Sequence, residues 1–101
     1  MPAVIVLDTV CVPSRDVVSR EVEGEIIIVP LVPGIGDGDE ELYTLNATGY
    51  EVWRRLDGQA TLGQIAVALA EEFDAPLEEA EADVLGFARE MARRRILRPG
   101  S

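Results

Sequence analysis

The sequence contains no histidine and no lysine, and it has a single cysteine, Cys11. Without histidine the chain lacks the most frequent general base, a common metal ligand and the side chain that titrates near neutral pH. Hydroxyl side chains such as Ser14, Tyr43 and Thr48 therefore have no histidine or lysine nearby to activate them as nucleophiles. A lone cysteine also forms no internal disulfide and no Cys-x-x-Cys metal pair. These absences predict a protein that is not an enzyme and that carries no cofactor or metal ion.

Long hydrophobic runs are also missing, which indicates where the protein is located, while its length indicates the number of domains. No run of about 18 apolar residues occurs, so we expect no membrane span. The N-terminus lacks the basic segment of a secretory signal, and its short apolar run ends at Asp8. A reducing cytoplasm is the expected compartment, with Cys11 as a small buried hydrophobic residue. The 101 residues suit one domain. We expect an N-terminal arm or extra strand over residues 1–12 and a single domain over 13–98.

Basic residues are few: the chain has nine arginines and 19 acidic residues, which give a net charge of −10. Binding to nucleic acid depends mainly on cationic contacts to phosphate, so this charge has the wrong sign for such a partner. The one basic cluster lies between Arg89 and Arg98. There the arginines are expected to stabilise the negative end of a helix, with contact to an acidic partner as the alternative.

The first half of the chain has the pattern of strands. β-Branched residues predict two strands over 16–22 and 25–30, joined by a turn at Glu23-Gly24 into a hairpin. Glycine, proline and aspartate predict a loop over 31–41, and a third short strand is expected over 41–45. If the third strand lies at a sheet edge, its unpaired N–H and C=O groups can accept another strand.

The second half has the pattern of three helices. Asn46 is a favourable N-cap for a helix that runs to about Leu56 and stops at Asp57-Gly58. Thr61 and Gln64 match a capping box that opens a second helix. Its apolar face is predicted to consist of Leu62, Ile65, Leu69 and Phe73. The third helix follows Pro76, and its predicted core face consists of Leu77, Ala80, Val84, Phe87 and Met91. Ile96 and Leu97 are expected to pack back on the core.

The order and spacing of these motifs resemble those of PqqD-like proteins from Pro13 to Leu97. The residues that carry the resemblance are 16–25, Leu45-Asn46-Ala47-Thr48-Gly49, Trp53, Leu56-Asp57-Gly58, Thr61, Asp83-Val84, Phe87, Met91 and Ile96-Leu97. The resemblance implies an α+β fold, a small winged helix-turn-helix-like domain in which a three-stranded antiparallel sheet is followed by three helices. The loop over 32–40 is longer than the tight turn that the family would have there.

The same resemblance implies a function. PqqD-like proteins are recognition elements for ribosomally synthesised and post-translationally modified peptides (RiPPs). They bind the leader of a precursor peptide as an added strand and present it to a modifying enzyme, such as a radical SAM enzyme, a protease or a cyclase. By position, the peptide cleft would be lined by Leu42, Tyr43, Thr44 and Leu45 from the third strand, and by Leu85, Ala88, Arg89, Ala92 and Arg95 from the last helix. Neither nucleic acid nor a membrane is an expected partner.

Two other functions fit parts of the sequence. A winged-helix DNA-binding regulator would share the implied fold, but the expected second helix carries Glu71 and Glu72 and no arginine. A small acidic carrier protein would need an accessible serine at the start of a helix, whereas Ser14, Ser19 and Ser101 fall in loop, strand or tail segments. The motifs do not distinguish pyrroloquinoline quinone (PQQ) synthesis from lasso-peptide or other radical-enzyme pathways.

Overall fold

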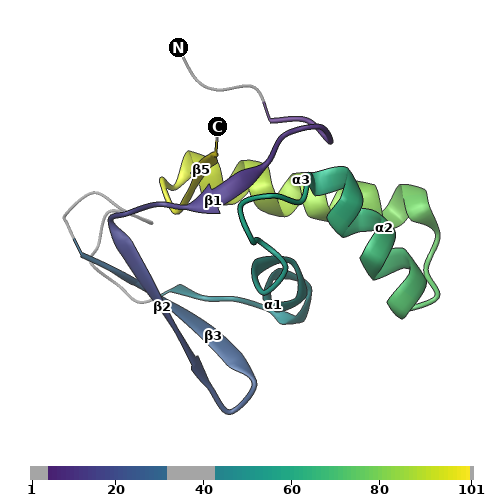
Figure 1. Cartoon of the computed structure of the whole chain (residues 1–101). Helices are drawn as coiled ribbons and strands as arrows, with labels where there is room; N and C mark the ends of the chain where they lie inside the picture. The colour runs from purple at the N-terminus through teal and green to yellow at the C-terminus, as the bar shows by residue number, and fades with distance from the viewer. Residues whose placement is uncertain (1–4, 32–42, 101) are drawn as a thin grey trace.

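A computed structural model of the chain describes residues 5–31 and 43–100, so Leu42 and the loop predicted over 32–40 lie outside the described residues. The elements are β1 (Cys11–Pro13), β2 (Val17–Val22), β3 (Glu25–Pro30), β4 (Tyr43–Thr44), α1 (Ala47–Trp53), α2 (Leu62–Glu72), α3 (Leu77–Arg93) and β5 (Leu97–Pro99). This is a small α+β domain with three helices and antiparallel sheets, as the sequence predicts. Figure 1 shows the β2–β3 hairpin projecting away from the helices.

β2, β3 and β4 form an antiparallel sheet in that order. The hairpin turns at Glu23 and Gly24, whose φ angles of 52° and 82° are both positive. Positive φ at both turn positions matches the twist of the flanking strands, which explains why a glycine stands here. On β3, Ile26 and Ile28 are buried while Ile27 is only half-buried, so one face of this sheet packs on the core. The predicted hairpin is confirmed.

A second antiparallel sheet joins the two ends of the described chain. β1 pairs with β5 in the register that places Cys11 opposite Pro99. The N-terminal segment also contacts α2, since the N–H of Leu62 donates to the carbonyl of Thr9 at 2.9 Å. Cys11 is fully buried, and this burial raises the pKa of its thiol. The segment expected to be an arm or an extra strand thus contributes a strand and a core residue.

The helix boundaries follow the capping residues. Asn46 caps α1. The helix ends at Trp53 rather than near Leu56, because the N–H groups of Arg55 and Leu56 donate to carbonyls only three residues earlier, those of Val52 and Trp53. Thr61 and Gln64 form the predicted capping box, with bonds of 3.1 and 2.8 Å. None of the helices in residues 5–31 and 43–100 is long and apolar enough to cross a membrane.

The core lies where the helices meet the inner faces of both sheets. On α3 the buried stripe consists of Ala80, Val84, Ala88 and Met91. The prediction of Leu77 as a core residue is wrong, because Leu77 is the first residue of α3 and its side chain is 45% exposed. Phe87 is half-buried at the border of the stripe. Ile96 and Leu97 are buried, as predicted.

Candidate functional site

β4 is an edge strand of its sheet in the described structure, so main-chain N–H and C=O groups on its outer side can bond to another strand. The N–H of Leu45 donates to the carbonyl of Ile26 at 2.9 Å, and Thr44 stands opposite Ile27 in the same register. In an antiparallel ladder hydrogen-bonded and non-hydrogen-bonded pairs alternate. The N–H and C=O of Thr44 therefore point away from β3, toward the open side of the sheet.

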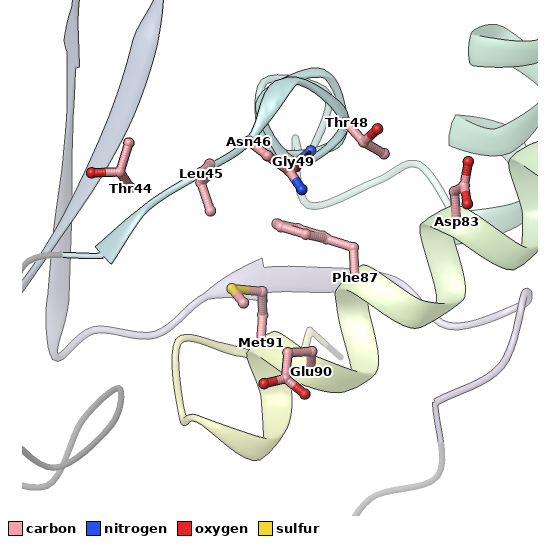
Figure 2. Close-up of a pocket in the computed structure, with 9 residues that line it drawn as sticks. All are labelled: Thr44, Leu45, Asn46, Thr48, Gly49, Asp83, Phe87, Glu90 and Met91. Carbon is pink, nitrogen blue, oxygen red and sulfur yellow. Dashed lines mark hydrogen bonds between the residues drawn. The ribbon is translucent and has the colours of Figure 1, made fainter.

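Beside this edge lies a groove of about 360 Å³ between β4, the start of α1 and α3. We call it the strand groove; it is lined by Thr44, Leu45, Asn46, Thr48, Gly49, Asp83, Phe87, Glu90 and Met91. Figure 2 shows the side chains of Leu45, Phe87 and Met91 converging on its interior, with Asp83 beyond Phe87 along α3. An apolar floor next to free main-chain groups is the arrangement that a bound strand requires.

Gly49 determines the shape of the strand groove. A Cβ atom at this position would stand 2.8 Å from Cε1 of Phe87 and 3.2 Å from Oδ1 of Asn46. Only glycine therefore allows the Phe87 ring to lie against the first turn of α1. The same turn is fixed by Asn46, whose Oδ1 accepts a 2.7 Å hydrogen bond from the N–H of Gly49. The segment Leu45 to Gly49 thus positions the groove and also lines it.

Replacing Asn46 with alanine is expected to destabilise the domain by about 1 kcal/mol, because the N–H of Gly49 loses its cap. Urea unfolding followed by circular dichroism measures the change. Asn46→Asp is the matched control, since a carboxylate oxygen can accept the same bond and should retain most of the stability. An alanine variant as stable as the wild type would contradict the capping role.

The charged residues of the strand groove differ in their surroundings. Glu90 accepts hydrogen bonds from Nη2 of Arg93 and Nε of Arg94, both at 2.6 Å. Both bonds lower the pKa of the Glu90 carboxyl, and the bond from Arg93 is the larger cause. Asp83 makes no ion pair within the described residues. One carboxylate of the groove is therefore largely neutralised by arginine, and the other is available to a ligand.

The structure brings the strand residues of the sequence prediction to this site. Thr44 and Leu45 line the groove, and Tyr43 contributes main chain to β4. Leu42 lies outside the described residues. The predicted helix residues lie outside the strand groove. Ala88 is fully buried in the core, and Leu85 is half-buried against it.

The remaining predicted residues line a different pocket. Arg89, Ala92 and Arg95 belong to a cavity of about 510 Å³ beside Ile5 and β5. Arg89 donates from Nε and Nη2 to the carbonyl of Ile5, at 3.0 and 2.9 Å. These residues lie away from β4 because the rotation of α3 about its axis turns a different set of side chains toward that strand. That set consists of Asp83, Phe87, Glu90 and Met91.

Sequence reasoning thus missed the helical wall and the α1 end of the groove. The available signal was the pair Phe87 and Met91, spaced by four residues and therefore on one face of α3. Both were assigned to the core alone. In the structure Met91 is 1% exposed and Phe87 is half-buried, so the core stripe and the groove floor share residues.

The fold and the groove define a class of protein: a small α+β domain with an open strand edge beside a helix. Residues 34–97 match the family model described as coenzyme PQQ synthesis protein D (PqqD). The chain belongs to the PqqD family.

Curated relatives cover part of the chain. A PqqA binding protein of Rhizobium meliloti (strain 1021) is 50% identical over 42 residues, which are 42% of this chain and 43% of the relative. A PqqA binding protein of Xanthomonas oryzae pv. oryzae (strain PXO99A) is 39% identical over 59 residues, or 58% of this chain and 64% of the relative. The chain therefore spans less than two thirds of the length of these relatives.

Two solved structures share the fold. One is the solution NMR structure of the PqqD truncation of Methylobacterium extorquens PqqCD, presented as a functional, stand-alone RiPP recognition element. It matches with a TM-score of 0.74 and 25% identity over 96% of this chain and 97% of that one. The other is TbiB1 in complex with the TbiA(beta) leader peptide, with a TM-score of 0.71 and 24% identity over 84% and 92% of the two chains. The second likeness concerns the fold alone.

Proposed function

We propose that this chain binds the leader segment of a ribosomally synthesised precursor peptide by β-strand addition and presents it to a modifying enzyme. The observation that carries the proposal is the edge position of Thr44, whose main-chain N–H and C=O point away from β3 and which also lines the strand groove. Membership of the PqqD family, in which relatives are called PqqA binding proteins, supports the same function. In the proposed function the protein binds the peptide without catalysing a reaction, and it needs no cofactor.

The binding mechanism follows from the geometry. The leader lies antiparallel to β4 and exchanges main-chain hydrogen bonds with Thr44, which supply affinity without regard to sequence. Alternate leader side chains point to one face of the added strand and contact Phe87 and Met91, which select apolar residues. Ordering of the flexible leader opposes binding and limits affinity.

Two finer features belong to the proposal. The helices and the β2–β3 hairpin are arranged as a winged helix-turn-helix-like domain, in which the hairpin is the wing. The enzyme that receives the peptide is a radical SAM enzyme, a protease or a cyclase, and the complex forms in the cytoplasm. The net charge of −10 favours a protein or peptide partner over nucleic acid.

Titration of the protein into a fluorescently labelled precursor peptide, encoded by a gene next to its own, tests this function. Fluorescence anisotropy should report saturable binding with a Kd of tens of micromolar or tighter, which corresponds to about −6 kcal/mol or better. A peptide with the same leader residues in scrambled order is the control. A folded protein that binds neither peptide, or both equally, would contradict the proposal.

A further inference from the structure

A second pocket adjoins the strand groove at the end of β4 that leads into α1. Its volume is about 310 Å³, and it lies between the start of α1, the end of α2 and the start of α3. We call it the helix pocket. Thr48 and Asp83 line both the helix pocket and the strand groove, so the two are neighbours that share one edge.

The floor of the helix pocket is apolar and partly open to water. Leu69, Phe73 and Ala80 form it. Phe73 is 54% exposed, although it is a large aromatic residue. Its backbone is fixed at the end of α2, since its N–H donates to the carbonyl of Leu69 at 3.0 Å. The exposed ring of Phe73 lies in the lining of one pocket with the buried side chains of Leu69 and Ala80, which together offer an apolar surface to a ligand.

The rim of the helix pocket is acidic. It carries Glu51, Glu79 and Asp83. Glu51 is paired with Arg55 at 2.7 Å. Glu79 and Asp83 make no ion pair with any residue in the described ranges. Two unneutralised carboxylates above an apolar floor are complementary to a ligand with one large apolar group and one nearby cation.

Strand direction decides which part of a leader reaches this pocket. β4 runs from Tyr43 to Thr44 and continues through Asn46 into α1. A leader strand that is antiparallel to β4 runs the opposite way, so its N-terminal end lies at Asn46 and Thr48. The helix pocket begins at Thr48. Residues that precede the strand segment of the leader therefore enter it.

We infer that the helix pocket binds a large apolar leader residue with an adjacent lysine or arginine, placed just N-terminal to the segment that adds to β4. This inference rests on the proposed function and specifies the class of peptide that the site takes. The apolar side chain packs on Phe73 and Leu69. The cationic side chain meets Glu79 and Asp83. The strand edge supplies affinity for any extended peptide, while the helix pocket supplies sequence selectivity.

A capped dipeptide tests the pocket without the leader, because a dipeptide is too short to add a strand. The probe is acetyl-Phe-Arg-amide, and acetyl-Phe-Glu-amide is its matched control. We expect saturable chemical-shift changes at the amides of Leu69 and Ala80 with a Kd of a few millimolar, roughly as a ligand of this size allows. The glutamate probe should bind about fivefold more weakly, as expected for exposed charge pairs.

Variants separate the helix pocket from other surfaces. Phe73→Ala should abolish the shift changes, whereas Leu77→Ala, which removes an exposed apolar side chain outside the pocket, should retain them. Glu79→Gln should weaken the arginine probe, and its neighbour Glu78→Gln should not. No saturable shift up to ~20 mM, roughly the limit for a specific weak ligand, would overturn the inference. So would equal binding of the two dipeptides.

The same assay distinguishes this inference from the proposed function. Thr44→Pro alters the strand edge and should leave dipeptide binding unchanged, while it removes leader binding. A protein that binds the dipeptide but no leader would refute the strand-addition proposal alone. A protein that binds the leader but not the dipeptide would refute the helix pocket alone.

Discussion

Replacing Thr44 with proline is expected to weaken leader binding severely while the domain stays folded. Proline has no N–H, and the N–H of Thr44 is the donor that the register directs away from β3. The bonds of β4 to β3 come from the flanking residues, as Leu45 to Ile26 shows, so the substitution costs no bond inside the sheet. Loss of a central main-chain bond, together with the bulk of the ring, should weaken binding about 30-fold or more, equivalent to ~2 kcal/mol.

Thr44→Val is the matched control, because valine keeps the N–H and the branched shape of threonine. Anisotropy titrations of both variants with the labelled leader measure the effect, and circular dichroism confirms that the helices remain. The valine variant should bind within about threefold of the wild type, as expected for an exposed surface substitution. Equal affinity of the proline variant and the wild type would show that the leader does not pair with β4.

Replacing Gly49 with alanine is expected to destabilise the domain by about 1–2 kcal/mol and to weaken leader binding at least tenfold, since overpacking displaces the Phe87 ring. The new Cβ would stand 2.8 Å from that ring. The sign of the stability change is informative, because alanine in place of glycine normally stabilises a helix by up to about 1 kcal/mol. Urea unfolding and leader titration measure the two effects.

A double-mutant cycle with Phe87→Leu isolates the cause. Leucine lacks the ring atom that Gly49→Ala would meet, so in this background the alanine substitution should be neutral or stabilising. If Gly49→Ala destabilises both backgrounds equally, the contact with Phe87 is not the reason for the glycine. Leader binding by the double variant should remain weak, because the ring forms part of the groove floor.

Local signals predicted most of the fold. Glu23-Gly24 indicated the hairpin because both turn positions need positive φ, and Asn46 and Thr61 marked helix starts through bonds within three residues. The β1–β5 sheet escaped prediction since it pairs residues almost ninety positions apart, here Cys11 with Pro99. No local pattern encodes such a pairing. Burial of Ile96 and Leu97 was predicted, but their continuation into a strand was not.

The candidate site was predictable only on its strand side. Thr44 and Leu45 were predicted from the family resemblance, which places the peptide along the third strand, and the free main-chain groups of an edge strand gave the physical reason for that position. The helical wall depends on the rotation of α3 about its axis, and a shift of one or two positions replaces Phe87 with Ala88 or Arg89. Sequence periodicity could not settle this rotation, because Met91 belongs to the core and to the groove at once.

Hydrogen exchange at the Thr44 amide tests strand addition most directly. Exchange rates of single amides, measured by NMR with and without saturating leader peptide, report whether that N–H becomes bonded. We expect the Thr44 amide to exchange at least about tenfold more slowly in the complex, as for a newly formed ladder bond. The Leu45 amide, already bonded to Ile26, serves as the internal reference. Saturation with peptide and an unchanged Thr44 rate would contradict binding by strand addition at β4.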